Sequence, residues 1–173
     1  MVYFAVFELG RAGCSVVIRI DRKLTMNFQP IFWGGLIAGT LDICAAFLTA
    51  WVRAGVSPVR VLHFVASGLI GAAAFNGGVK TAILGLALHF LIATAATVVF
   101  YLASRKWLFL IEHPINFGLL YGIAVYLFMN FVVLPLSSVA QRPMTLSGFI
   151  IGILTIMFCV GLPIALIVRR FAR

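Results

Sequence analysis

Four long apolar runs that carry no Lys or Arg constrain the fold of this chain most strongly. Each run has 22 or 23 residues, which corresponds to about 33 to 35 Å of α-helix and is enough to cross the hydrocarbon core of a bilayer. The runs cover residues 31–52, 81–103, 116–138 and 147–168. We therefore predict an all-α polytopic membrane protein, folded as a transmembrane helical bundle.

The composition of the 173-residue chain excludes a water-soluble domain. Hydrophobic residues make up 64% of the chain, charged residues make up 10%, and the mean hydropathy is +1.17. A globular protein of average composition has about a quarter of its residues charged, and these cover its surface in water. The net charge of +9 does not indicate nucleic acid, because the basic residues lie between the apolar runs, where they orient membrane spans. We expect a lipid bilayer as partner.

A fifth apolar segment, residues 61–75, is ambiguous. Its 15 residues would extend about 22 Å as a helix, which is short for a span. If the segment lies at the surface, the four spans leave nine Lys and Arg residues on one side and four on the other, whereas a crossing gives six against seven. The positive-inside rule favours the first arrangement. We predict four spans, one interfacial helix over 61–75 and two cytoplasmic termini.

Residues 1–25 form an N-terminal extension ahead of a single transmembrane domain at 26–173. The charges of the extension are interspersed with apolar residues, so it lacks the uninterrupted core of a signal peptide. Two interpretations stay open: an amphipathic extension, or a stretch upstream of a translation start at Met26. Four of the nine cytoplasmic charges precede Met26, so the second interpretation reduces the charge split to five against four.

Glycines four residues apart occur on three of the predicted spans. In lipid, helices associate by close van der Waals approach, and such a pair leaves a groove for a neighbouring backbone. The pattern predicts a tight bundle or an oligomer. Pro135 and Pro163 fall inside spans and predict bends. The glycine pairs are Gly35 with Gly39, Gly118 with Gly122, and Gly148 with Gly152.

Each predicted span also carries a polar side chain at a similar depth. Counted at 1.5 Å per residue from the span ends, Asp42 and His89 lie about 16 and 14 Å deep, and Asn130 and Thr155 lie about 12 Å deep. An ionisable group at such a depth is costly unless it is paired or hydrated. Three interpretations of this predicted polar layer stay open: hydrogen bonds that fix helix register, a proton or ion path, and no mutual contact.

No sequence motif indicates catalysis. Cys14, Cys44 and Cys159 are too far apart for a metal knuckle or a redox pair, and we interpret them as small buried residues. Haem ligation by His89 is disfavoured, since a second histidine at the same depth is missing. His63 would face His89 only if the segment 61–75 crossed the membrane. We expect no catalytic residue, no cofactor and no metal.

Three stretches carry a family resemblance: GTLDICAAFLTAW, GLALHFLIATAA and YGIAVYLFMNFVVLPLS. They are similar to a group of small bacterial inner-membrane proteins to which no activity is assigned. The resemblance runs from about residue 34 to residue 138. It implies a four-span bundle in the bacterial plasma membrane, and it implies no activity or cofactor.

These observations favour a non-enzymatic protein. We expect a structural or accessory subunit that packs against other membrane helices within a larger membrane complex. The alternative is a small oligomeric transporter or channel that uses Asp42, His89 and Asn130. Transporters of this size usually need an oligomer or an internal repeat to form a pathway, and the two halves of this chain show no convincing similarity.

Overall fold

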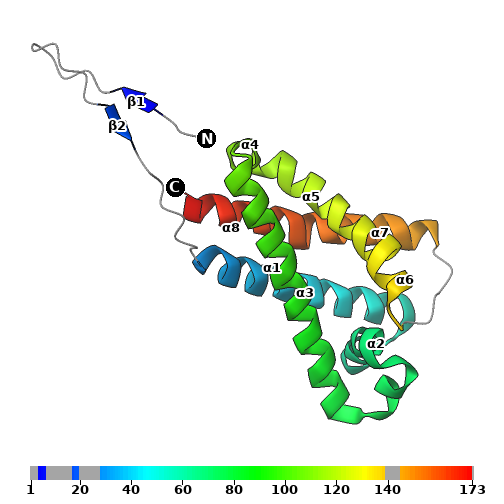
Figure 1. Cartoon of the computed structure of the whole chain (residues 1–173). Helices are drawn as coiled ribbons and strands as arrows, with labels where there is room; N and C mark the ends of the chain where they lie inside the picture. The colour runs from blue at the N-terminus through cyan, green and yellow to red at the C-terminus, as the bar shows by residue number, and fades with distance from the viewer. Residues whose placement is uncertain (1–3, 7–16, 20–27, 139–144, 173) are drawn as a thin grey trace, which may run out of the picture.

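The computed structural model describes residues 4–6, 17–19, 28–138 and 145–172. Two short strands, β1 (Phe4–Val6) and β2 (Val17–Arg19), pair in antiparallel fashion. Every other element of the described chain is helical (Figure 1), which confirms the all-α class. The rest of the predicted extension, with Cys14, lies outside the described residues.

Five helical segments in the described chain are long and apolar enough to cross a membrane. The first and third are the uninterrupted helices α1 (Gln29–Ala54) and α3 (Gly78–Lys106). The second combines helix α2 (Pro58–Ile70) with the 3₁₀ turn η1 (Gly71–Asn76). A short helix, α4 (Phe109–Glu112), follows α3.

The last two apolar segments are each interrupted by a π-helical turn. One consists of α5 (Pro114–Phe128), η2 (Met129–Val133) and α6 (Leu134–Leu136). The other consists of α7 (Leu146–Ile156), η3 (Met157–Gly161) and α8 (Leu162–Ala172). Pro135 follows η2 and Pro163 follows η3. Because proline lacks an N–H and its ring crowds the carbonyl four residues earlier, a wider turn just before it relieves the clash.

Prolines and glycines mark the helix ends. Pro30, Pro58 and Pro114 each lie in the first turn of a helix, where an absent N–H costs nothing. Ser57 caps α2 by accepting a hydrogen bond from the Arg60 N–H. Gly55 ends α1 in the left-handed conformation, with φ 60°, which glycine adopts without strain.

Helix α1 packs antiparallel against α3. Gly34 lies against Thr97, and Gly39 lies against Phe90 and Ala93, so residue numbers rise along α1 as they fall along α3. A buried cluster in the first half of α1 brings α1, α3, η3 and α8 together, and it is the hydrophobic core of the bundle. Its members are Ala38, Phe100, Val160, Ile164, Ala165 and Val168.

The last segment also runs antiparallel to α1. Arg53, near the end of α1, donates a hydrogen bond of 3.0 Å from Nη2 to Oγ of Ser147 at the start of α7. At the other end, the core residues of α8 contact the first half of α1. We call the end of the bundle where α1 begins and α8 ends the α4 end, and the opposite end the α2 end (Figure 1).

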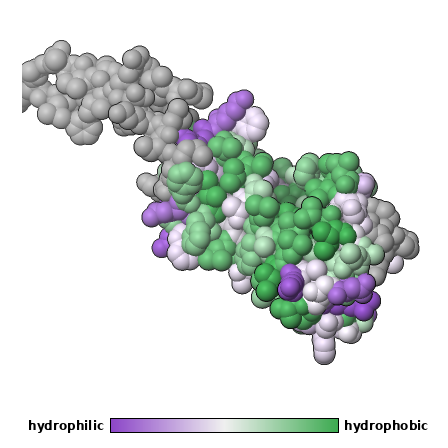
Figure 2. Space-filling model, turned by 60° about the horizontal axis from the view of Figure 1, so that its bottom comes forward, coloured by the Kyte–Doolittle hydropathy of each residue, from purple (hydrophilic) through white to green (hydrophobic). Residues whose placement is uncertain are grey.

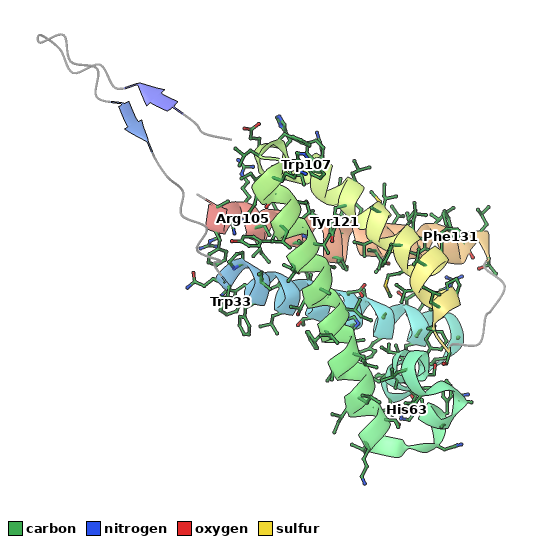
Figure 3. All side chains as sticks on the ribbon, in the orientation of Figure 1. Trp33, His63, Arg105, Trp107, Tyr121 and Phe131 are labelled. Carbon is green, nitrogen blue, oxygen red and sulfur yellow. The ribbon has the colours of Figure 1, made fainter. Side chains whose placement is uncertain are left out.

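Helix α2 and turn η1 lie at the α2 end, where Figure 1 draws α2 nearly along its axis. The N–H of Ser138, just past α6, donates to the carbonyl of Gly68 at 3.1 Å. The buried side chain of His63 donates from Nε2 to the carbonyl of Gly78 at 2.8 Å, at the start of α3 (Figure 3). Helix α2 is therefore hydrogen-bonded to the start of α3 and to the residue that follows α6.

Apolar side chains cover the outside of the helices. In Figure 2 hydrophobic residues dominate the middle of the visible face, and hydrophilic ones gather toward its two ends. Trp33 and Trp107 lie toward the α4 end (Figure 3), and Trp51 is 62% exposed near the other end of α1. Indole rings at two levels and an apolar band between them are typical of a protein embedded in a bilayer.

Candidate functional site

Asp42 and His89 lie within electrostatic range of each other in the middle of the bundle. Asp42 is nine residues from Trp33 and nine from Trp51, so it marks the midpoint of α1. His89 of α3 is close enough to attract the Asp42 carboxylate electrostatically. His89 also donates a hydrogen bond of 2.9 Å from Nε2 to the carbonyl of Gly39, one turn before Asp42. The His89 side chain therefore connects α3 to α1 near mid-span.

The Asp42 carboxylate is partly buried, yet no residue of the described chain donates a hydrogen bond to it. A third side chain, Cys159 of η3, lies within electrostatic range of it. The site therefore takes one side chain from each of three helical segments. An intramembrane carboxylate that lacks a hydrogen-bond donor can still bind a proton, or accept a hydrogen bond from a water molecule or a partner protein.

The other two members of the predicted polar layer do not join this pair through hydrogen bonds. Asn130 lies in η2, and its Nδ2 donates to the carbonyl of Tyr126 in its own segment at 2.9 Å. Thr155 lies about one turn before Cys159, and the described residues show no hydrogen bond from its hydroxyl. Counting depth along straight helices misses the tilt of the spans and the extra residue of a π turn.

The positions of Cys159 near Asp42 and of Tyr121 against α3 could not be predicted from the sequence. The Tyr121 hydroxyl of α5 donates to the carbonyl of Ala96 in α3 at 2.6 Å, and Figure 3 shows the side chain between these helices. A tyrosine inside an apolar run gives no signal of its partner. For Cys159, the only hint in the sequence is its position four residues before Pro163. A proline disturbs the helix at the carbonyl four residues before it, so an irregular turn is expected at Cys159.

Most of the predicted glycines lie where two helices touch. A Cβ on Gly35 would come within 2.9 Å of Thr94 Cα, and one on Gly122 within 2.5 Å of Met157 Cα. Gly148 differs, since the nearest atom is the hydroxyl of its own helix cap, Thr145. The remaining contacts are Gly39 with Phe90, Gly118 with Ala165, and Gly152 with Tyr126.

Two further glycines make the closest approaches to the backbone of another helix, and the four-residue spacing did not select them. A Cβ on Gly85 of α3 would collide with the carbonyl of Leu62 in α2. A Cβ on Gly161 of η3 would collide with the carbonyl of Gly118 and the backbone of Gly122 in α5. Apart from Gly148, the glycines of the predicted pairs therefore lie at contacts between helical segments of the same chain.

Comparison with protein-family models, curated proteins and solved structures gives no match for this chain. The resemblance to small bacterial inner-membrane proteins accordingly stays a prediction. Within the described ranges, no group of three His, Cys, Asp or Glu side chains is arranged to hold a metal ion.

Proposed function

We propose that four segments cross the membrane and that α2 with η1 lies at its surface. Helices α1 and α3 pack antiparallel. If both cross the membrane, the single segment between them, α2 with η1, cannot cross it as well. The start of α2 follows the end of α1, and its last turn is bonded to the residue after α6, so both ends of α2 belong to the same end of the bundle. A crossing helix would have its ends on opposite sides.

We place the α4 end in the cytoplasm of a bacterial cell, with the bundle in the inner membrane. Four basic residues of the described chain gather at this end, namely Arg105, Lys106, Arg169 and Arg170. Three lie toward the α2 end, namely Arg53, Arg60 and Lys80. Counted over the whole sequence, the four basic residues of the predicted extension and Arg173 raise the first number to nine, and Arg142 raises the second to four. The positive-inside rule assigns the richer end to the cytoplasm.

Cysteine labelling in intact cells is expected to show both flanks of α2 outside the cytoplasm. In a background without native cysteines, Val56→Cys and Asn76→Cys should both react with a membrane-impermeant thiol reagent, and Lys106→Cys should react only after lysis. If only one of the two flanking positions reacts, α2 crosses the membrane and the four-span arrangement is wrong. Reaction of Lys106→Cys alone in intact cells would invert the orientation.

We further propose that the protein is a non-enzymatic structural or accessory subunit. The observation that carries this proposal is the way polar side chains form hydrogen bonds between helices. His89, Tyr121 and His63 each donate to a backbone carbonyl of another helix. Such bonds fix pairs of helices, and in lipid each contributes about 1 kcal/mol. Together with glycine contacts between the helices, they build a rigid block with an apolar exterior for neighbouring membrane helices.

Native mass measurement in mild detergent tests this role. We expect a complex of defined stoichiometry with unrelated membrane subunits, which should lose this chain when an outward-facing apolar surface is changed. A homo-oligomer that carries an ion flux in liposomes would overturn the accessory role. It would favour the second candidate function, an oligomeric transporter or channel, for which the carboxylate of Asp42 without a hydrogen-bond donor is the specific support.

A further inference from the structure

A small pocket with charged walls lies at the α4 end of the bundle. Its volume is about 290 Å³, close to the lower bound of about 300 Å³ for pockets that hold drug-sized ligands. It is lined by the turn between α4 and α5 and by Arg169 of α8. We call it the headgroup pocket, and it is lined by Glu112, His113, Pro114, Ile115, Asn116 and Arg169.

The two opposite charges of the headgroup pocket do not pair with each other. Neither the Glu112 carboxylate nor the Arg169 guanidinium forms an ion pair or a hydrogen bond with another described residue. Held apart across an open pocket, they match a ligand that carries both a negative and a positive group.

The surroundings of the pocket belong to the depth of lipid headgroups. Helix α5 begins at Pro114, and α8 ends three residues after Arg169. Trp107, 50% exposed, precedes α4, and indole rings favour the interface between headgroups and acyl chains. Ile115 lines the pocket and is 58% exposed. It offers an apolar surface where the glycerol and first acyl carbons of a lipid would lie.

We propose that the headgroup pocket binds a zwitterionic aminophospholipid from the adjacent leaflet. Arg169 would hold the phosphate by charge-assisted hydrogen bonds, with the Asn116 amide and the His113 imidazole as further donors. The Glu112 carboxylate would accept from the primary ammonium. A purely anionic lipid satisfies Arg169 but leaves Glu112 facing negative charge, so the carboxylate provides the selectivity. The proposal does not depend on the accessory role.

Native mass spectrometry of the full chain in detergent tests this assignment with two lipids of identical acyl chains, phosphatidylethanolamine and phosphatidylglycerol. We expect retention of the ethanolamine lipid to exceed that of the glycerol lipid by about fivefold, which corresponds to one exposed ion pair. Glu112→Gln should abolish this preference. Arg169→Gln should weaken both lipids by about tenfold, as expected for loss of a hydrogen bond to a charged group.

Arg170→Gln is the matched control, because Arg170 is adjacent, exposed and absent from the pocket lining. It should leave retention of both lipids unchanged. Equal losses for Arg169→Gln and Arg170→Gln, or no lipid preference in the parent protein, would overturn the proposal. Displacement of the lipid by millimolar phosphoethanolamine or inorganic phosphate would assign the pocket to a soluble phosphate compound instead. Unchanged thermal melting of each variant verifies that the fold is intact.

Discussion

Replacing Gly161 by alanine is expected to destabilise the bundle by about 3 kcal/mol, the upper range for overpacking a tight core. The added Cβ would lie 2.6 Å from the amide nitrogen of Gly122 and 2.7 Å from its Cα, and closer still to the Gly118 carbonyl. All of these atoms are backbone. No side chain can rotate away, so α5 and η3 would have to separate, and the neighbouring core around Val160 and Ile164 would lose contacts.

Unfolding in mixed micelles with increasing denaturing detergent measures this free energy. Ala124→Val is the matched control, since it adds more volume to α5 at an exposed position and should change the free energy of unfolding by less than 0.5 kcal/mol, as is usual for surface positions. Equal stability of the Gly161→Ala variant and the parent would show that α5 and η3 do not touch through their backbones.

Asp42 and His89 are expected to contribute to stability as a coupled pair. His89→Ala should cost about 2 kcal/mol, because it removes the hydrogen bond to the Gly39 carbonyl and leaves a gap between α1 and α3. Asp42→Asn should cost less in the His89→Ala background than in the parent. The double-mutant cycle should give a coupling of about 1 kcal/mol.

A third substitution separates the hydrogen bond from the charge. His89→Gln keeps an N–H that can donate to the Gly39 carbonyl but lacks an ionisable ring, so it should retain stability and lose the coupling to Asp42. Asn130→Ala serves as the control, because its bond stays within its own segment and its effect should add to that of His89→Ala. Strict additivity of Asp42→Asn and His89→Ala would exclude a direct interaction.

The same variants distinguish the two functions. If the pair only fixes helix register, Asp42→Asn in an assembled protein should leave the activity of the host complex intact. If protons pass through the pair, both Asp42→Asn and His89→Gln should abolish flux although folding survives, since a relay needs each titrating group in turn. Measurement of flux in liposomes, beside the unfolding free energy of the same preparations, separates these outcomes.

The sequence by itself determined the class of the protein and the positions of its helices. Runs of 22 or 23 residues without Lys or Arg can satisfy their backbone in lipid only as helices, so their existence follows from length and hydropathy alone. Pro30 and Pro114 lie in first turns as their chemistry requires. The segment predicted over 61–75 is longer in the structure, Pro58–Asn76, and is long and apolar enough to cross, so length alone does not decide whether it does.

Only the tertiary structure decided which side chains meet. In a soluble helix the apolar stripe shows which face points inward, but these spans are apolar all round, so the sequence does not mark their faces. The pairing of Gly161 with α5, the bond from His89 to Gly39 and the approach of Cys159 to Asp42 depend on rotation and tilt of whole helices. The rotation and tilt of each helix are set by its close packing against neighbouring helices, and this packing is visible only in the three-dimensional structure.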